Sequence, residues 1–456
     1  MIRLGTATRD ITPTRPALIQ GQKHARLGQT ALDPITVTAW ALGDATDHAV
    51  LVSCDLAFPS DALYVAVRAQ LAANLPEINP DAVILLATHT HTSLVLEDGF
   101  YPHPGGEVMT AAECESLVAS KIVEAVIQAW GSRRDHILRH AFGHAVVGHN
   151  RYAVYANGEG QMYGKTRRDD FSHIGGYEDH SVDMLFAWDA AGRLSGVLLV
   201  LPCPSQVDEH LREFSADYWH EMRAELRQRL DDGAGSTDLS ILGLCGAAGD
   251  QPPHFLLHGD EEQEMRQRRG LSERQEIAER VADAVERALA CTPPVDTASV
   301  LRHQWRNLAL SPRRISQKER DWSAAAYEDA VSKGDTDSWW PTGLRRVVET
   351  FDGLRQSPPV ATEIHAVRID DLVLTTNPFE LFLDYGLRIK ARSPAQQTLV
   401  VQLAGRGMYL PTARAVEAGS YGALPVVTPV GPEGGAELVE ETLALIADVY
   451  PEDPQP

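Results

Sequence analysis

Apolar residues in the first part of the chain are grouped in short runs that end in polar residues. Residues 82–87 are an unbroken apolar run, and residues 49–53 form a second, mostly apolar one. Between them, Ser60 is suited to cap a helix that continues to about residue 73. The pattern predicts a strand–helix–strand unit whose second strand is buried on both faces.

Helical periodicity marks three further segments. Thr110, with a glutamate three residues on, has the capping-box spacing and opens a predicted helix that continues to residue 130. Ser272 opens a second helix in the same way, and Ser215 is expected to cap a third. The apolar positions that repeat are Ile277, Val281, Val285 and Leu289 in the second helix, and Tyr218, Met222, Leu226 and Leu230 in the third.

Strands are predicted between and after these helices. In chain order they are a strand near 144–152, a hairpin within 181–206, a strand at 239–244, paired strands at 362–377 and a strand at 398–404. A further helix, from Pro378 to about Lys390, is predicted before the last strand. Strands and helices that alternate in this way are typical of an α/β fold. We therefore predict a mixed β-sheet core flanked by helices.

The domain organisation is expected to be simple, because no internal repeat is present. We predict one domain over residues 1–450. Residues 311–360 are polar, contain several tryptophans and have no regular period, which indicates a peripheral helical insertion or lid. The tail at 451–456 is predicted to be disordered.

The composition narrows the choice of partners and compartment. The 41 Lys and Arg residues against 63 Asp and Glu give a formal net charge of −22, which repels nucleic acids and anionic membranes. The start lacks the apolar core of a signal peptide, and no segment approaches the length of a membrane span. Five scattered cysteines, an odd number, indicate a reducing compartment. We predict a cytoplasmic protein that acts on a small molecule.

The most informative candidate site follows the apolar run at 82–87. His89 and His91 stand just past it, with a threonine on either side. Ligands of open α/β sheets bind beyond the carboxyl ends of the strands. Side chains two residues apart on extended backbone point the same way, so both imidazoles are expected to face one pocket. The alternative is a pair of histidines that bond to nearby loops and have no chemical role.

Several predicted strand ends carry polar or titratable residues, among them Asp55, Cys203, Asp250, Glu380 and Tyr409. At these places the sequence resembles the neutral/alkaline (non-lysosomal) ceramidase superfamily, whose members cut the N-acyl amide bond of ceramide. The shared elements, in the family's order from residue 2 to 422, are GTATRDITP, VSCDL, ATHTHTS, GHNR, CGAAGD, the Glu380 segment and MYLPT. The resemblance implies the catalytic domain of that fold, without the C-terminal immunoglobulin-like domain of the secreted enzymes.

The resemblance also implies a zinc site. By position, its ligands are His89, Glu380, Tyr409 and, where the family has a second histidine, Cys203. A thiolate is a good zinc ligand, so Cys203 can keep a four-donor site. The alternative for Cys203 is a small buried apolar residue.

Three further positions are implied to be catalytic. His91 is expected to accept or relay a proton from the attacking water. Tyr421, twelve residues after Tyr409, and Arg151 are expected to stabilise the oxyanion or to hold a carbonyl or carboxylate of the substrate. As alternatives, Tyr421 is an aromatic residue at the edge of the core and Arg151 belongs to a surface ion pair.

One departure from the family changes the expected reaction. Pro252 stands where the family has the serine of its Gly-Asp-x-Ser-Pro loop, so no serine nucleophile is available there. Zinc can lower the pKa of water from about 15.7 to about 7, which supplies a nucleophile without a protein side chain. We predict a zinc-dependent hydrolase that cleaves an amide or, as second choice, an ester of a soluble small molecule. The backbone of Gly249 and Asp250 is expected to line its pocket.

Two other functions remain open. In a binuclear metal hydrolase of the amidohydrolase type, His89 and His91 would both bind metal, but eight clear strand–helix units for a barrel are absent from the predicted pattern. The substitutions at Cys203 and Pro252 are also compatible with a catalytically inactive, metal-bound binding module. The oligomeric state is left open.

Overall fold

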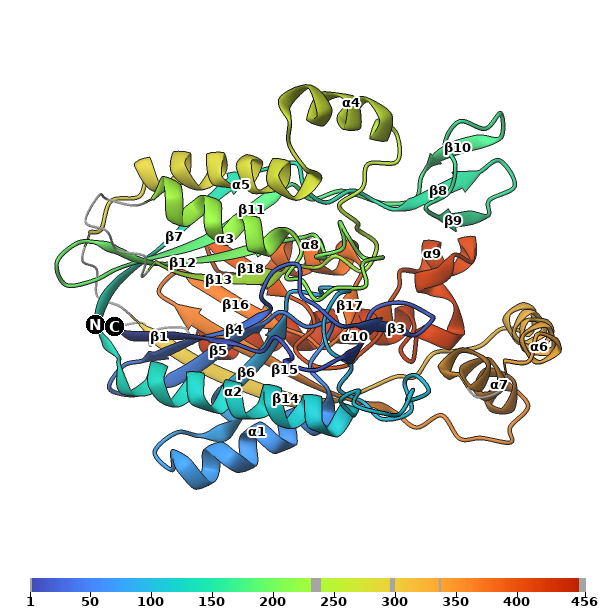
Figure 1. The fold of residues 1–456 in the computed structure, drawn as a ribbon, viewed down its shortest axis with the longest axis horizontal. Helices are drawn as coiled ribbons and strands as arrows, with labels where there is room; N and C mark the ends of the chain where they lie inside the picture. Colours follow the sequence, from blue (N-terminus) through green and yellow to red (C-terminus); the bar gives the residue numbers. More distant parts are fainter. Residues whose placement is uncertain (1, 231–238, 296–299, 336–337, 451–456) are drawn as a thin grey trace.

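The computed structural model describes residues 2–230, 239–295, 300–335 and 338–450. The predicted disordered tail at 451–456 lies outside these ranges. Within them the strands form a sheet of eight and a sheet of four, together with three small sheets. Figure 1 shows the two large sheets at the centre and helices on their outer sides.

The eight-stranded sheet has the order β13-β12-β11-β7-β1-β4-β5-β6. The pairs β5/β6 and β12/β13 are parallel, and the other neighbours are antiparallel, so the predicted mixed sheet is confirmed. Its strands are β1 (Ile2–Asp10), β4 (Thr36–Gly43), β5 (His48–Cys54), β6 (Val83–Ala87), β7 (Arg134–His144), β11 (Ser181–Trp188), β12 (Leu194–Leu201) and β13 (Ser240–Cys245).

Four helices cover the outer face of this sheet: α1 (Asp61–Asn74), α2 (Ala111–Gly131), α3 (Tyr218–Arg229) and α5 (Glu273–Ala290). Three of them begin as predicted. Ser60 accepts from the Leu63 N–H at 3.0 Å, and Thr110 and Ser272 form complete capping boxes. These caps use backbone N–H groups that have no partner inside the helix, and they fix where each helix starts.

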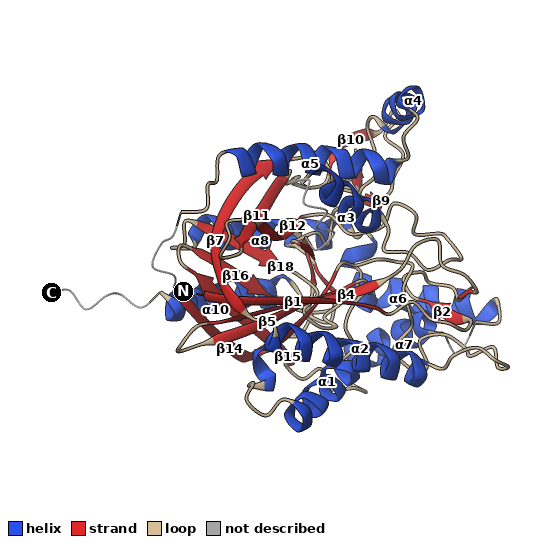
Figure 2. Cartoon of the chain, turned by 60° about the vertical axis from the view of Figure 1, so that its left-hand side comes forward, coloured by secondary structure: helices blue, strands red, loops and turns tan. Residues whose placement is uncertain are grey.

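The second sheet, in the order β14-β15-β16-β18, packs against the inner face of the first. Leu4, Trp40 and Leu198 of the large sheet meet Val367, Leu374 and Leu399 of the small one in a fully apolar layer. Helices α8 (Leu383–Arg392) and α10 (Pro432–Val449) cover the other face of the second sheet, so the molecule has four layers (Figure 2). The strands are β14 (Leu301–Leu310), β15 (Val360–Ile369), β16 (Leu372–Thr376) and β18 (Gln397–Val401).

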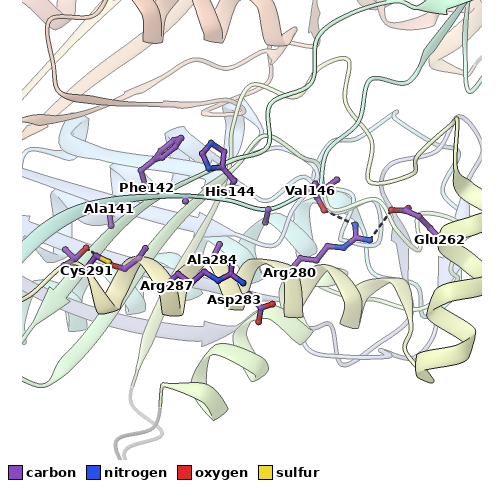
Figure 3. A pocket seen from close by; sticks show the side chains of 14 residues that line it. Ala141, Phe142, His144, Val146, Glu262, Arg280, Asp283, Ala284, Arg287 and Cys291 are labelled. Carbon is purple, nitrogen blue, oxygen red and sulfur yellow. Dashed lines mark hydrogen bonds and ion pairs between the residues drawn. The ribbon is translucent and has the colours of Figure 1, made fainter.

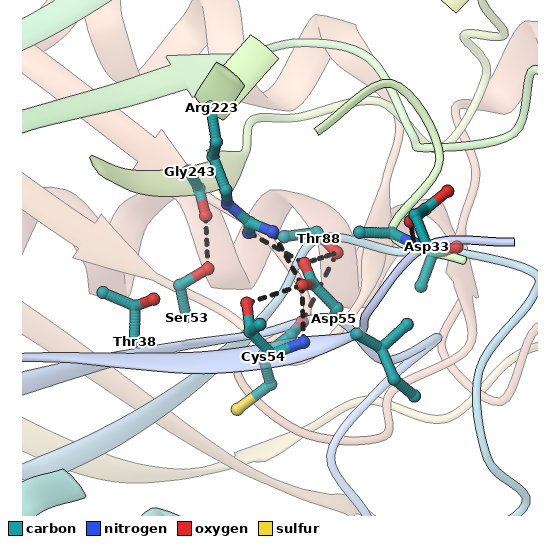
Figure 4. A network of polar contacts seen from close by, with 12 residues as sticks. Asp33, Thr38, Ser53, Cys54, Asp55, Thr88, Arg223 and Gly243 are labelled. Atoms are coloured by element: carbon teal, nitrogen blue, oxygen red, sulfur yellow. Dashed lines mark hydrogen bonds and ion pairs between the residues drawn. The ribbon is translucent and has the colours of Figure 1, made fainter. Parts of the chain in front are cut away.

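The large sheet is bent so that strand ends from its two edges meet. The Ser53 hydroxyl at the end of β5 donates to the Gly243 carbonyl of β13 at 2.6 Å, and Ser205 after β12 donates to the Thr88 carbonyl after β6 at 2.8 Å. The Asp55 carboxylate accepts two hydrogen bonds from Arg223 of α3, at 2.7 and 2.9 Å (Figure 4). This buried pair ties α3 to the end of β5, and the Thr88 hydroxyl, just before His89, donates to the same carboxylate at 3.2 Å.

Three predicted elements differ from the structure. Residues 145–151 form a loop between β7 and β8 (Tyr152–Tyr155), because their N–H groups bond to other loops, as His149 does to the Pro252 carbonyl at 2.9 Å. Asp217, and not Ser215, caps α3; the Ser215 hydroxyl instead donates to Asp33 at 2.6 Å. Helix α8 begins at Leu383, because Glu380–Leu381 are held in a short strand.

The range 311–360 contains two helices, α6 (Gln317–Ser332) and α7 (Trp339–Phe351), which pack on each other between β14 and β15. They project from one end of the molecule (Figure 1). Lys23, between the short strands β2 (Ala17–Ile19) and β3 (Arg26–Gly28), lies 4.0 Å from the ring centre of Trp340 of α7. In the described part of the chain, no helix has the length and apolar character needed to cross a membrane.

Candidate active site

Six of the seven predicted site residues line a single cavity of about 360 Å³. The cavity lies beyond the ends of β5, β6 and β12, where the bend of the sheet brings these ends together. The lining residues predicted from the sequence are His89, His91, Arg151, Glu380, Tyr409 and Tyr421.

His89 is held so that one ring nitrogen is free to bind a ligand. Its Nδ1 lies 2.6 Å from the Ala57 carbonyl, which can only accept, so Nδ1 carries the proton. Nε2 is buried, has no hydrogen-bond partner and lies 3.2 Å from a carboxylate oxygen of Glu380. A histidine fixed through Nδ1 by a carbonyl, with Nε2 exposed to a site, is the usual arrangement of a metal ligand.

The backbone of His89 differs from the extended conformation predicted for it. Its φ is +62°, in the left-handed region, so the rule for extended residues two apart does not apply. The chain turns at His89, and the rings of His89 and His91 meet edge to face at 4.9 Å between centroids. Both rings line the cavity, by a different geometry from the one expected.

Strained backbone is concentrated around this cavity. Six described residues other than glycine have positive φ, and four of them line it: His89, Tyr163, Leu403 and Met408. Such conformations cost about 1–3 kcal/mol each and are typical of functional sites, where the surrounding structure enforces them.

Glu380 and Tyr409 are brought together by two short strands that the sequence did not reveal. β17 (Glu380–Leu381) pairs in parallel with β19 (Tyr409–Leu410), and Glu380 is the register partner of Tyr409. Burial would raise the pKa of Glu380, but nearby positive charge, from Arg151 and from His89 whenever its ring is protonated, and a hydrogen bond from Tyr409 lower it below the usual value. Glu380 is therefore an ionised carboxylate facing Nε2 of His89.

His91 is oriented by two side chains from the loop after β12. Its Nδ1 lies 3.0 Å from the Glu209 carboxylate, and its Nε2 lies 2.8 Å from the Gln206 amide nitrogen. Since the carboxylate accepts and the amide donates, Nδ1 carries the proton and Nε2 carries the lone pair. Burial lowers the pKa of His91, so the ring is neutral near pH 7 and can accept a proton at Nε2.

Arg151 is buried beside the carboxylate and the phenol. One terminal nitrogen donates to the Gly249 carbonyl at 2.7 Å, and the guanidinium lies 5.3 Å from the ring centre of Tyr409. Its Nε has no hydrogen-bond partner. The surface ion pair considered as an alternative is absent, because Arg151 is only 4% exposed and forms no ion pair with any described residue.

Gly249 and Asp250 support the site from behind and do not line the cavity, which corrects the sequence prediction. The Asp250 carboxylate accepts from the Asn150 side chain at 2.8 Å and from the Leu383 N–H at 2.9 Å. A Cβ on Gly249 would lie 2.3 Å from the Glu380 carbonyl oxygen, so only glycine fits there. The two residues thus fix Arg151 and β17 relative to each other.

Cys203 is not among the residues that line the cavity. Its sulfur lies 3.8 Å from the Val147 carbonyl and 3.5 Å from the Pro204 carbonyl, and burial raises the pKa of the thiol. Pro252 also lies away from the cavity, and its carbonyl accepts from the His149 N–H. The structure thus brings together His89, Glu380 and Tyr409, and it places the Cys203 sulfur elsewhere.

A metal ion in this cavity would need three protein donors around one position. Among the described residues, no three His, Cys, Asp or Glu side chains converge on a possible metal position, so Tyr409 would have to be the third protein donor. Two donors about 2.0–2.1 Å from zinc at a tetrahedral angle lie about 3.4 Å apart. The 3.2 Å between His89 Nε2 and Glu380 is close to this spacing. His89 and Glu380 thus have the spacing of two zinc ligands, and Tyr409, the register partner of Glu380, would be the third.

Sequence reasoning missed further polar residues of the cavity, among them Lys23, Tyr163, Gln206 and Glu209. Gln206 and Glu209 follow the end of β12 as His91 follows β6, so a search for polar residues beyond every strand end would have found them. Lys23 and Tyr163 lie in loops that have no recognisable pattern.

A second hollow, of about 780 Å³, lies between β7 and α5 (Figure 3). Two of its charged residues have partners outside the hollow or on its wall: Arg280 donates to Glu262 at 3.1 Å and to the Val146 carbonyl at 3.0 Å, and Asp283 accepts from Arg229 at 2.6 Å. It shares no lining residue with the cavity around His89.

Comparison with known proteins identifies the fold. No protein-family profile matches the sequence, and no curated protein matches it. The crystal structure of neutral ceramidase from Pseudomonas aeruginosa superposes with a TM-score of 0.70 at 15% identity, over 100% of this chain and 75% of that chain. A ceramidase complexed with C2 superposes with a TM-score of 0.67 at 15% identity, over 98% of this chain and 75% of that chain.

The protein is therefore an α/β protein with the neutral ceramidase fold, as the resemblance in sequence predicted. An identity of 15% establishes the fold alone, because one fold carries many activities.

Proposed function

We propose that the protein is a zinc-dependent hydrolase that cleaves the amide bond of a small molecule. The observation that carries this proposal is the contact between His89 Nε2 and Glu380 at 3.2 Å. With a neutral ring, a lone pair faces an ionised carboxylate in a buried site, which is repulsive. A cation bound by both atoms would turn this repulsion into two favourable bonds.

The hydrogen bonds of His91 and the fold favour a single metal ion. His91 Nδ1 bonds to Glu209 and its Nε2 accepts from the Gln206 amide, so a second ion beside His89 would have to displace Gln206. The mixed eight-stranded sheet also differs from the barrel of the binuclear amidohydrolases. Both features favour the mononuclear site over the binuclear alternative.

Zinc, when bound, polarises a carbonyl and makes water acidic enough to supply a nucleophile near neutral pH. When a water takes the place of the Gln206 amide at Nε2, His91 can accept the proton of that water, and Glu209 stabilises the imidazolium that results. Burial, and then Glu380, raise the pKa of Tyr421, so its hydroxyl stays protonated and can donate to an oxyanion. Arg151 supplies the second donor, through its unpartnered Nε.

The fold, which both superposed ceramidase structures share, supports an amide as the bond that is cleaved. Pro252 carries no hydroxyl and does not line the cavity, so we propose direct attack by water without a covalent serine intermediate. A burst phase of product release is accordingly not expected.

The test compares the wild type with Glu380→Ala, using zinc-loaded protein and a panel of N-acyl amides and matched esters. We expect one zinc per chain and amide turnover in the wild type. Removing a carboxylate ligand should lower turnover by at least about 100-fold and weaken zinc binding. Turnover that does not depend on Glu380 would contradict the proposal. Zinc binding without turnover of any substrate would instead favour the binding module.

A further inference from the structure

Two cationic side chains of the cavity form no ion pair with a carboxylate of any described residue. One is Arg151, buried beside Glu380 and Tyr409 at the proposed reaction centre. The other is Lys23, in the loop between β2 and β3. Within the described ranges, neither residue forms an ion pair. In a protein with a formal net charge of −22, unpaired cations in one small cavity require an explanation.

Lys23 is fixed in place although it has no ionic partner. Its ammonium lies 4.0 Å from the ring centre of Trp340 on α7 and 4.2 Å from that of Tyr421. Cation–π contacts of this kind attract an ammonium to the face of an aromatic ring. Aromatic faces orient the ammonium but accept none of its N–H groups as an oxygen would, so its three donors remain available to solvent or ligand.

The other charged groups of the cavity already have partners. Arg406 pairs with Glu97 at 2.7 Å, Glu209 bonds to His91, and Glu380 faces His89. Lys23 is therefore the exposed cation that an entering anion can bind without breaking an existing ion pair. It stands on the Tyr421 side of the cavity, whereas Arg151 stands against Tyr409, whose ring lies 5.8 Å from that of Tyr421.

We propose that the substrate is an N-acyl amide that bears a free carboxylate, and that Lys23 binds this carboxylate. The inference rests on the proposed hydrolase function and specifies its substrate class. The amide carbonyl would lie at His89, Glu380 and Arg151, with the carboxylate toward Lys23, Trp340 and Tyr421. The overall acidic charge of the protein repels anions in general, so a local cation is needed to select one.

The test uses two probes that differ only in charge, N-hexanoylglycine and its neutral carboxamide, with cleavage of the hexanoyl amide followed by release of the amine. The variants are Lys23→Gln and Lys23→Arg, with Lys121→Gln as a matched control, because Lys121 pairs with Glu124 on the outer surface of α2. Thermal unfolding of each variant checks that the fold is kept.

We expect Lys23→Gln to raise KM for the acid about tenfold, the usual effect of losing one charge-assisted hydrogen bond, with kcat nearly unchanged. KM for the carboxamide should not move. Lys23→Arg should keep most of the preference for the acid over the carboxamide, and Lys121→Gln should keep all of this preference. Equal changes for both probes in Lys23→Gln, or no preference for the acid in the wild type, would overturn the inference.

Calorimetric binding of both probes to Glu380→Ala, with and without Lys23→Gln, separates this inference from the proposed reaction. Tighter binding of the acid that depends on Lys23, together with a zinc-loaded wild type that cleaves neither probe, would support the carboxylate site and refute the hydrolase. Cleavage of the carboxamide as efficiently as the acid would support the hydrolase and refute the carboxylate site.

Discussion

At the scale of single residues, the site depends on the tautomer and position of two side chains. The Ala57 carbonyl fixes the proton of His89 on Nδ1, and the pairing of β17 with β19 sets Glu380 opposite Nε2. That His89, Glu380 and Tyr409 line one cavity was predictable from their places near predicted strand ends and from the resemblance in sequence. The direction of the Cys203 sulfur was not, because it depends on carbonyls from residues 147 and 204 that packing brings together.

Gly249→Ala tests whether the position of Glu380 is as critical as this geometry implies. The new Cβ would lie 2.3 Å from the Glu380 carbonyl oxygen, so β17 must move. A displacement of about 1 Å at a reacting group can cost about 100-fold in rate, and we expect a loss of kcat/KM of that order together with weaker zinc binding. Gly131→Ala, where a Cβ would meet nothing within 4 Å, is the control. Full activity of Gly249→Ala would show that Glu380 tolerates displacement.

At the scale of helices and strands, caps and turns in the sequence were sufficient to predict where several elements begin. The caps at Ser60, Thr110 and Ser272 place the starts of α1, α2 and α5, and the hairpin of β11 and β12 follows its turn. The pairing of β17 with β19 could not be predicted, because two-residue strands have no period to detect. The loop at 145–151 was wrongly predicted as a strand because its apolar residues pack without a β-ladder partner.

The β14/β15 pair carries a buried histidine that should make stability depend on pH. Burial and the neighbouring His365 lower the pKa of His303 to about 3, and its Nε2 lies 3.1 Å from His365 Nδ1. In the unfolded chain the pKa returns to about 6.5. Below pH 6.5 the unfolded state therefore binds a proton that the folded state does not, so stability falls as the pH is lowered.

We expect this histidine to reduce the free energy of unfolding by roughly 2 kcal/mol between pH 7 and pH 5. Urea unfolding at the two pH values measures the loss. His303→Gln should remove most of the His303 contribution, whereas the same substitution at the exposed His103 should leave the loss unchanged. An identical pH dependence in the wild type and His303→Gln would contradict the assignment.

At the scale of the whole molecule, the site is produced by the packing of two sheets. The mixed α/β class was predictable from the order of elements. The way the two sheets face each other was not predictable, because the apolar patterns around Trp40 and Leu374 indicate that these residues are buried but not which residues they contact. The bend that joins the ends of β6 and β12 depends on contacts between residues far apart in sequence, such as Ser205 with Thr88.

The central claim is that His89, Glu380 and Tyr409 bind one metal ion. Anomalous diffraction at the zinc edge from crystals grown with zinc tests it most directly. We predict a single peak bonded to His89 Nε2, Glu380 and Tyr409 at about 2.0–2.2 Å, with the fourth position open to water. A cavity with no peak between His89 and Glu380, in crystals that bind zinc elsewhere, would contradict the account.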